Sequence, residues 1–330
     1  MNIGKVPENI LKRSILKKIS KRRSEVLLGA TLGEDCAVLT LSNDDLCVLT
    51  TDPVTAINKD YGKYAINNVC NDLFSTGSEP IGVLVILLLP IETEESTIKK
   101  IMDELELEAS KLNLEILGGH SEITDAVIKP VITVTGVGKA KKEKLVSTKG
   151  AAPGDDIVVT KWIGLEGTAI LASEYEQKLL EKFPARMVYE AKEYDRYLSV
   201  ANETAPAVKS GVTAMHDVSE GGIFAALWSL ASASHVGLEA DLKKIPIKQE
   251  TIEICNFFDL NPYCLMSAGS LLITCKNGEK LIADLAKEGI PSAVIGTITN
   301  SNDKVIINGE NKRFLDLPKT DEIYKIKERI

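Results

Sequence analysis

The sequence predicts a two-domain protein of mixed α/β (α+β) structure. Its 330 residues are more than one hydrophobic core usually contains, because a domain has roughly 150 residues. Short apolar runs alternate with amphipathic helical patterns in both halves. Between them, Gly136 to Pro153 is rich in Gly, Lys, Ala and Pro and has little apolar periodicity. We therefore expect domains at residues 1–150 and 151–330, with the boundary near Gly150.

The composition excludes several classes of protein. Hydrophobic residues make up 44% of the chain and charged residues 26%, which is ordinary for a packed globular protein. The net charge of −8 repels phosphate backbones and disfavours nucleic-acid binding. Met1 to Lys21 lacks the continuous apolar stretch of a signal peptide, and no apolar run approaches the ~20 residues that span a bilayer. The sequence predicts no nucleic-acid or membrane partner.

The six cysteines form no close C-x-x-C pair, so they indicate neither a zinc ribbon nor a thioredoxin-type site. We expect them to be small, buried apolar residues. Unpaired cysteines together with the absence of a signal peptide predict a reducing, cytoplasmic location.

The first half is expected to contain both helices and strands. Helical spacing predicts a surface helix at Glu8–Ser20 and further helices at Tyr61–Ser75 and Glu94–Leu112. Cys36–Leu41 and Leu46–Thr51 flank a turn-rich segment, which predicts a β-hairpin. Further strands are expected at Ile81–Leu89, Leu114–Leu117 and Val131–Val137. The continuous apolar run of Ile81–Leu89 is typical of a strand covered on both faces, or of one that lines a subunit interface.

The second half is expected to alternate strands and helices. The predicted elements are strands Asp156–Thr160 and Val212–Met215 and helices Gly167–Leu180, Arg186–Tyr197 and Gly222–Ser234. Mixed α/β layers follow from this order.

Common catalytic and nucleotide-binding motifs are missing. The sequence has no G-x-x-x-x-G-K-[ST], and Gly136-Val137-Gly138-Lys139 lacks the third glycine of a dinucleotide fingerprint. It also has no G-x-S-x-G elbow and no H-E-x-x-H helix. The sequence thus disfavours a P-loop or Rossmann mechanism and the simplest hydrolases.

Four aspartates at the ends of apolar runs are the main candidates for chemistry: Asp35, Asp52, Asp72 and Asp217. Converging carboxylates repel one another, so a cluster is tolerated mainly where divalent cations neutralise it. Mg²⁺ with a polyphosphate fits, because Mg²⁺ takes few carboxylates together with phosphate oxygens and water. For each aspartate singly, a turn former or a helix cap is the alternative.

Two glycine pairs and two histidines accompany the aspartates. Gly118-Gly119 follows the strand Leu114–Leu117, and Gly221-Gly222 opens a helix; backbone without Cβ suits phosphate binding at such places. Ser219 is either the N-cap of that helix or a ligand contact. His120 and His216 flank these glycines as candidate metal ligands, phosphate contacts or bases, with a structural role as the alternative.

Read in order, GEDCAVL, LTTDPVT, NNVCNDLFSTGSEP, GGHSEIT, TKWIGLEGTAIL and MHDVSEGG resemble the serial motifs of the AIR synthase-like (PurM-like) superfamily. The likeness spans about Gly4 to Ile298, and the forms GGHSEIT and HDVSEGG resemble its AIR synthase-related, HypE-like branch. This resemblance implies an N-terminal domain that pairs with a second copy to form a dimeric β-barrel, and a C-terminal α/β domain that completes each nucleotide cleft.

The resemblance also implies ATP and Mg²⁺ as cofactors and assigns site residues. Metal and phosphate ligands would be Asp35, Asp52, Asp72 and Asp217. Catalytic residues would be Asp52, Asp72, His120 and Asp217. Further nucleotide contacts would be Asn68, Ser219, Glu220 and Gly221, and a loop under the nucleotide would consist of Gly118, Gly119, His120 and Ser121.

Superfamily members activate an oxygen, sulfur or selenium centre with ATP, and HypE-type enzymes dehydrate a thiocarbamate on their own C-terminal cysteine. Here the printed sequence ends Glu328-Arg329-Ile330 and its last cysteine is Cys275, so self-carried cyanide chemistry is not expected. His120 also replaces a commonly acidic residue, and SEGG stands where T-R-G-G is usual.

Three hypotheses about function follow. The first is an ATP- and Mg²⁺-dependent enzyme that activates a small amide-like or acid substrate, free or protein-borne, by phosphoryl transfer. The second is a non-catalytic nucleotide-binding maturation or regulatory protein, related to hydrogenase maturation. The third is a metal-dependent hydrolase that uses His120, His216 and the aspartates without ATP.

Overall fold

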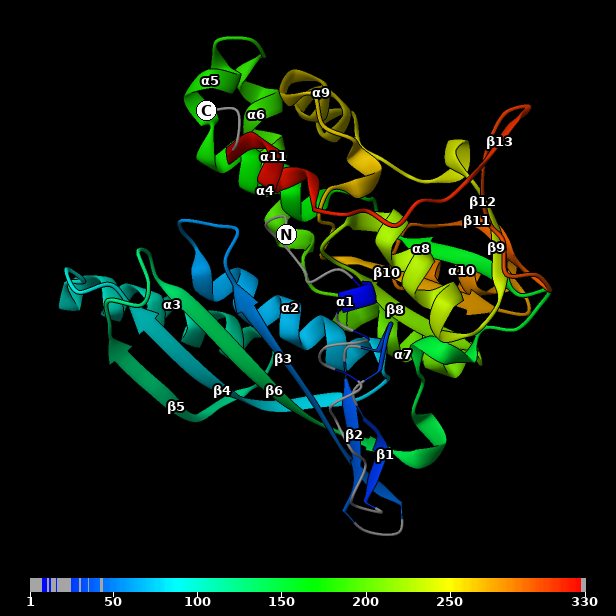
Figure 1. Ribbon diagram of the computed structural model, residues 1–330, viewed down its shortest axis with the longest axis horizontal. Helices are drawn as coiled ribbons and strands as arrows, with labels where there is room; N and C mark the ends of the chain where they lie inside the picture. Colours follow the sequence, from blue (N-terminus) through cyan, green and yellow to red (C-terminus); the bar gives the residue numbers. More distant parts are fainter. Residues whose placement is uncertain are drawn as a thin grey trace.

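The computed structural model describes residues 8–10, 12, 16, 25–29, 31–34, 36–41 and 44–327, which form two β-sheets with helices packed against them (Figure 1). The predicted mixed α/β class is confirmed. Within the helix predicted at Glu8–Ser20 the structure defines α1, Glu8–Ile10; much of the rest of that stretch lies outside the described residues, as does Asp35.

The first sheet has six strands in the order β1-β2-β3-β6-β4-β5, and every neighbouring pair is antiparallel except β4 and β5. Its strands are β1 (Val26–Leu28), β2 (Ala37–Thr40), β3 (Asp45–Val54), β4 (Glu79–Leu89), β5 (Glu115–Ile123) and β6 (Val131–Lys141). Helices α2 (Tyr61–Ser75) and α3 (Glu95–Lys111) pack on each other, and α2 packs on the sheet. The predicted hairpin is confirmed as β2 and β3, and the predicted helix Tyr61–Ser75 as α2.

The second sheet has seven strands in the order β13-β12-β9-β11-β7-β10-β8, with β9 and β12 as its parallel pair. Its strands are β7 (Asp156–Thr160), β8 (Ala214–Val218), β9 (Gly237–Asp241), β10 (Ser270–Cys275), β11 (Ser292–Thr299), β12 (Lys304–Asn308) and β13 (Asn311–Phe314). The helices of this half are α4 (Leu165–Glu174), α5 (Glu176–Leu180), α6 (Ala185–Lys192), α7 (Ala201–Lys209), α8 (Gly222–Ala233), α9 (Gln249–Phe258), α10 (Gly278–Lys287) and α11 (Glu322–Lys327). Helix α7 was not expected from the sequence.

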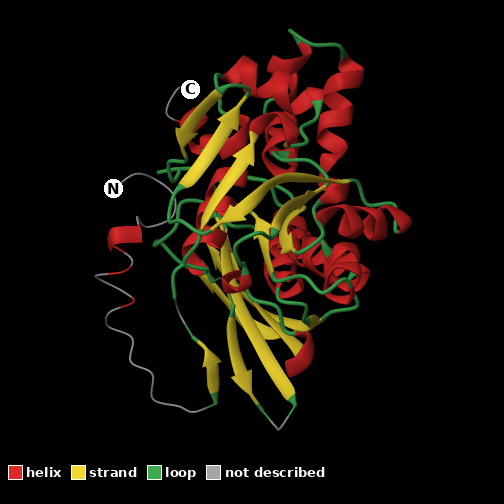
Figure 2. Cartoon of the chain, turned by 90° about the vertical axis from the view of Figure 1, so that its right-hand side faces the viewer, coloured by secondary structure: helices red, strands yellow, loops and turns green. Residues whose placement is uncertain are grey.

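Both halves contribute to one hydrophobic core. Its buried members include Ile66 and Val69 of α2, Leu171 of α4 and Ile323 of α11. In Figure 1, α11 (red) lies beside α4 (green) although they are far apart in the sequence, and in Figure 2 most helices lie above and to the right of the long strands. The first sheet ends at Lys141 and the second begins at Asp156, while the boundary at Gly150 stays a prediction.

Strand β4 differs from the expectation that it is covered on both faces. Its burial alternates along the strand, and Ile81, Leu84 and Ile86 are exposed by 42%, 41% and 39%. The opposite face packs into the core through Val83, Val85 and Leu87. A continuous apolar run does not distinguish a doubly covered strand from one whose second face is open in the single chain.

The predicted loop of Gly118, Gly119, His120 and Ser121 is wrong, because all four residues lie inside β5 and pair in parallel register with β4. A Cβ on Gly119 would lie 1.8 Å from the carbonyl oxygen of Val85. Glycine is required here by the close approach of the neighbouring strand, and the same residue type had been interpreted as a loop signal.

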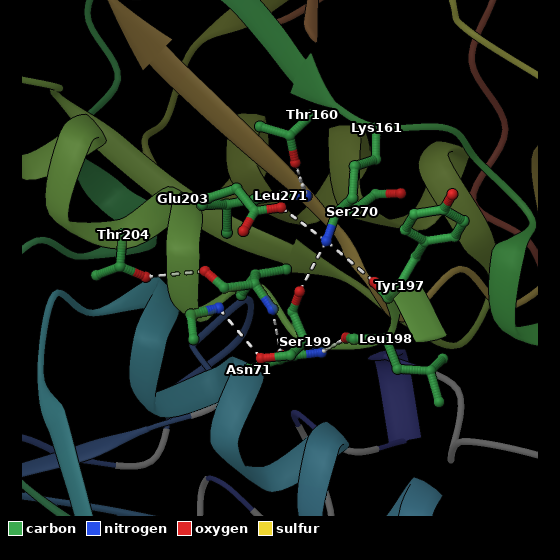
Figure 3. A network of polar contacts seen from close by, with 12 residues as sticks. Asn71, Thr160, Lys161, Tyr197, Leu198, Ser199, Glu203, Thr204, Ser270 and Leu271 are labelled. Atoms are coloured by element: carbon green, nitrogen blue, oxygen red, sulfur yellow. Dashed lines mark hydrogen bonds and ion pairs between the residues drawn. The ribbon is translucent and has the colours of Figure 1, made fainter. Parts of the chain in front are cut away.

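A polar network joins α2 to the second half of the chain (Figure 3). The Asn71 side chain, fully buried, donates to the carbonyl of Leu198 at 2.7 Å and accepts from the amide of Val200 at 3.0 Å. Behind this segment, Lys161 donates to the carbonyls of Tyr197 and Ser199 and pairs with Glu203 at 2.7 Å. Backbone groups of the segment 197–200 are therefore held from both sides.

Both members of the Lys161–Glu203 pair are buried, with side chains exposed by 9% and 2%. Burial lowers the pKa of the Lys161 ammonium, and Glu203 partly offsets that effect. A charge left in this position without its partner would be strongly destabilising, because no water can replace the lost interaction.

We expect Lys161→Met to lower the free energy of unfolding by about 3–5 kcal/mol, because it strands the Glu203 carboxylate in the core. Chemical denaturation measures this. The matched control is Lys99→Met, which breaks an exposed ion pair with Glu95 and should cost about 0–1 kcal/mol. Equal effects of the two substitutions would show that Lys161 does not hold the segment.

Candidate functional site

A cavity of about 430 Å³ gathers residues from both halves of the chain. Its lining comes from β3 and the segment after it, α2, α4, β8 and the turn after it, the loop before β10, and α11. The lining residues are Asp52, Pro53, Val54, Thr55, Ala56, Ile57, Tyr64, Asn68, Asp72, Glu166, Asp217, Ser219, Glu220, Met266 and Tyr324. Six residues predicted from the sequence lie together here: Asp52, Asn68, Asp72, Asp217, Ser219 and Glu220.

Helix α2 contributes one face to this cavity. Tyr64, Asn68 and Asp72 follow one another at four-residue intervals, so their side chains share one side of the helix. The Thr50 hydroxyl of β3 donates to the Asp72 carboxylate at 2.6 Å, which fixes Asp72 between helix and sheet. Asp72 lies inside the helix and is 5% exposed, so the alternative interpretation as a helix cap is wrong.

Asp52 and Asp217 reach the cavity from strands. Asp52 lies in β3, opposite Val134 of β6, and Asp217 lies in β8, opposite Leu271 of β10. Neither is a turn former or a cap. Thr50 and Asp52 are two residues apart in the strand and so lie on the same face, which directs both toward α2.

The turn between β8 and α8 places Ser219 and Glu220 at the cavity. Gly221, at φ 84°, is the N-cap residue of α8, so the interpretation of Ser219 as the N-cap is wrong. The Gly221 amide donates to the Asp321 carboxylate at 2.6 Å. A Cβ on Gly222 would lie 2.7 Å from two backbone oxygens, so this glycine is required by the neighbouring loop of the protein itself.

Glu166 is a cavity residue that the sequence analysis missed. It is 1% exposed, and its carboxylate accepts from the Ala268 amide at 3.1 Å and from the Asn68 side-chain amide at 3.3 Å. Burial raises its pKa to about 7, against the hydrogen bonds from Ala268 and Asn68 and together with repulsion from Glu220 and Asp52. A single acidic residue in the motif GLEGTAIL gave no periodic or pairing signal that distinguishes it from a solvated helix residue.

The C-terminal segment also supplies residues that were not predicted. Asp321, buried to 1% exposure, accepts from the amides of Gly221 and Ile323, and burial raises its pKa to about 7. It thereby ties the start of α11 to the start of α8. Tyr324 of α11 then lines the cavity, and burial raises the pKa of its hydroxyl to about 12.

The structure does not bring the β5 residues to this cavity. Gly118, Gly119, His120 and Ser121 are exposed, and the His120 imidazole lies 3.4 Å from Glu122. His216 is buried in β8 next to Asp217. Neither His120 nor His216 lines the cavity, so within one chain the two histidines do not join the aspartates there as a metal hydrolase would need.

Among the residues that the structure describes, no three His, Cys, Asp or Glu side chains are close enough to form a metal site by themselves. The carboxylates of Asp52, Asp72 and Asp217 nevertheless line one cavity. This donor set suits Mg²⁺, which takes one or two carboxylates and completes its shell with phosphate oxygens and water.

The cysteines are free thiols, and four of them, Cys36, Cys70, Cys255 and Cys275, are buried as expected. Cys47 and Cys264 are half-buried. None of the six lines the cavity.

Two family models match the chain. The description "AIR synthase related protein, N-terminal domain" matches residues 33–140, and "AIR synthase related protein, C-terminal domain" matches residues 152–308. The chain belongs to the AIR synthase related family. The resemblance stated from the ordered motifs is confirmed. The N-terminal match lies in the half of the chain that carries the first sheet, and the C-terminal match lies in the half that carries the second sheet.

Named relatives of this AIR synthase related protein include hydrogenase maturation proteins. A "Putative hydrogenase expression/formation protein" of Methanocaldococcus jannaschii is 25% identical over an alignment 342 positions long, which covers 98% of this chain and 97% of the relative. The carbamoyl dehydratase HypE of Rhodobacter capsulatus is 25% identical over 276 residues, covering 82% and 78%. The crystal structure of hydrogenase maturation protein HypE in complex with ATP matches with a TM-score of 0.69 and 18% identity, covering 97% of each chain. This structural likeness supports the fold.

None of the helices in the described part of the chain is long and apolar enough to cross a membrane.

The raised pKa of Glu166 predicts a pH-dependent stability. The unfolded chain ionises this residue near pH 4.5 and the folded chain only near 7, so its contribution is present below pH 4.5 and lost as the pH rises through 7. Glutamine mimics the protonated form. The free energy of unfolding of Glu166→Gln minus that of the unmodified protein should therefore be about 3 kcal/mol larger at pH 8 than at pH 4.5. Chemical denaturation at both pH values measures this difference. A pH-independent difference would contradict the burial argument.

Proposed function

We propose that this protein is an ATP-binding, Mg²⁺-dependent enzyme that activates a small amide-like or acid substrate by phosphoryl transfer. The observation that carries the proposal is the convergence of Asp52, Asp72 and Asp217 on one cavity, together with Asn68 and Ser219. Such a group of carboxylates is electrostatically costly unless the ligand brings cations with it.

The relatives support the same interpretation. One solved structure with this fold is a HypE in complex with ATP, another is AaThiL complexed with AMPPCP and TMP, and a third is a thiamine monophosphate kinase (thil) of Aquifex aeolicus. The R. capsulatus relative is named for a dehydratase activity, and curated relatives at 23–29% identity are named selenide, water dikinase. The names describe a dehydratase and dikinases, and one of the solved structures holds ATP.

In this mechanism Asp52, Asp72 and Asp217 are the residues that would hold Mg²⁺. The ion supplies neutralisation of the phosphate charge when it is bound. The hydrogen bond from Thr50 keeps the Asp72 carboxylate turned toward the cavity. Asn68 and Ser219 supply polar contacts that orient the bound molecule, so the contribution of the protein is mainly positioning and electrostatic stabilisation.

We infer that a second copy of the chain completes the site. The exposed apolar residues of β4, Ile81, Leu84 and Ile86, lie beside the exposed edge strand β5. Pairing of two such sheets into a β-barrel would bury this surface and cover the edge. His120 and Ser121 lie on that exposed strand, so they would take part in the interface.

The alternative is a non-catalytic nucleotide-binding protein related to hydrogenase maturation. The name of the M. jannaschii relative, a putative hydrogenase expression/formation protein, supports the link to hydrogenase maturation. A crystal structure of a HypE–HypF complex also shares this fold. In that case the protein binds ATP and releases no ADP or AMP with any acceptor. With either function the six free thiols favour a cytoplasmic location.

Asp52→Asn and Asp72→Asn should each weaken Mg²⁺–ATP binding at least about tenfold, because each removes a charge that holds the cation. Isothermal titration calorimetry with and without Mg²⁺ measures the loss. The control is Asp103→Asn, the same change on the exposed side of α3. Unchanged affinity in both cavity variants would refute the proposed cation site.

The proposed homodimer predicts that Leu84→Asp converts a dimeric protein to monomers, because it places a charge in the centre of the apolar face of β4. Light scattering coupled to gel filtration gives the mass. Leu107→Asp, on α3 and 56% exposed, is the control and should leave the dimer intact. A monomeric unmodified protein would rule out the interface.

A further inference from the structure

Hydrogen-bond acceptors predominate in the cavity lining, and the part of the lining around Glu166 is held in a fixed position. The described lining includes the carboxylates of Asp52, Asp72, Glu166, Asp217 and Glu220, and it contains no Lys, Arg or His. Its neutral side-chain donors are hydroxyl groups and the Asn68 amide, which already donates to Glu166. A ligand that fits this lining has to bring its own hydrogen-bond donors or cations.

Glu166 is held rigidly at the start of α4. A Cβ on the neighbouring Gly167 would lie 2.4 Å from the Leu265 side chain, and the Gly167 amide donates to the Met266 carbonyl at 3.0 Å. The two hydrogen bonds to Glu166, from Ala268 and Asn68, use about half of the roughly four acceptor positions of a carboxylate. Acceptor positions of Glu166 therefore remain for a ligand in the cavity.

Asn68 adds a second acceptor beside it. The ionised form of Glu166 only accepts hydrogen bonds, so with this form Asn68 turns its amide nitrogen toward Glu166 and its carbonyl oxygen away. That oxygen, Oδ1, is buried and has no hydrogen-bond partner among the described residues. A buried acceptor of this kind is costly unless a ligand or water satisfies it.

We propose that Glu166 and Asn68 form a subsite that binds the N–H-bearing edge of the ligand, an amino, amidino or amide group, and that rejects a carboxylate at the same place. The proposal rests on the proposed function for the identity of the cavity as the reaction site. It narrows the substrate class, because an acid substrate would place its negative charge against Glu166.

This edge has two possible sources in an ATP-dependent enzyme. One is the exocyclic amine of the adenine base, and the other is the amide-like acceptor. Inosine triphosphate separates them, since it carries a carbonyl oxygen in place of that amine. Acetamidinium, acetamide and acetate test the acceptor without any nucleotide.

The experiment compares the full-length protein with Glu166→Gln and Asn68→Ala. Glu174→Gln, which changes another glutamate of α4 that does not line the cavity, is the control. Calorimetry gives the affinities for ATP and ITP in the presence of Mg²⁺. Thermal unfolding measures stabilisation by each small molecule as the shift of Tm relative to the same variant without ligand, so that a variant's own loss of stability is subtracted.

If adenine is the source, the unmodified protein prefers ATP to ITP by about tenfold or more, and Glu166→Gln removes most of that preference. If the acceptor is the source, ATP and ITP bind alike, and acetamidinium and acetamide stabilise the unmodified protein but not the variants. Acetate stabilises neither the unmodified protein nor the variants.

The subsite is refuted if Glu166→Gln and Asn68→Ala leave both the nucleotide preference and the small-molecule stabilisation unchanged. Failure of the proposed function gives a different result, in which the unmodified protein binds neither ATP nor ITP. The acetamidinium measurement still decides the subsite in that case.

Discussion

Helix α2 is the element on which the arrangement of this protein depends, because each of its faces has a different task. Tyr64, Asn68 and Asp72 line the cavity, while Val69 and Leu73 pack so closely on β6 that a Cβ on Gly136 would lie 2.4 Å from Val69. A third face carries Asn71 to the backbone of the segment 197–200. A shift of this helix would therefore disturb the core, the contact between the halves and the site together.

The cavity keeps several carboxyl groups close together although they repel one another. Burial and neighbouring carboxylates raise the pKa of Glu166 to about 7, and burial does the same for Asp321. These groups remain buried because backbone amides of Ala268, Gly221 and Ile323 donate to them. The cavity thus presents an excess of hydrogen-bond acceptors, with which a cationic or N–H-bearing ligand would pair, and this excess is the physical basis of its selectivity.

Much of the fold could be predicted where the sequence carries a local periodic signal. Tyr61–Ser75 and Asp156–Thr160 match α2 and β7 residue for residue, and the shared cavity was foreseen for Asp52, Asp72 and Asp217 from their ordered motifs. The exposed face of β4 could not be foreseen, since exposure of an apolar run depends on what the other segments leave uncovered. The glycines of β5 were misleading for a related reason, because glycine marks both a loop and a close strand contact.

Glu166, Asp321 and Tyr324 could not be found in the same way, because their role depends on contacts between segments far apart in the chain. The Asp321 carboxylate joins the start of α11 to the start of α8, and this connection carries Tyr324 to the cavity beside residues of β3. Ile323 and Ile326 of the same helix are buried in the core shared by both halves. Because the last described helix forms this wall of the site, the cavity is complete only once both halves have packed. Ligand binding should therefore stabilise the chain as one unit.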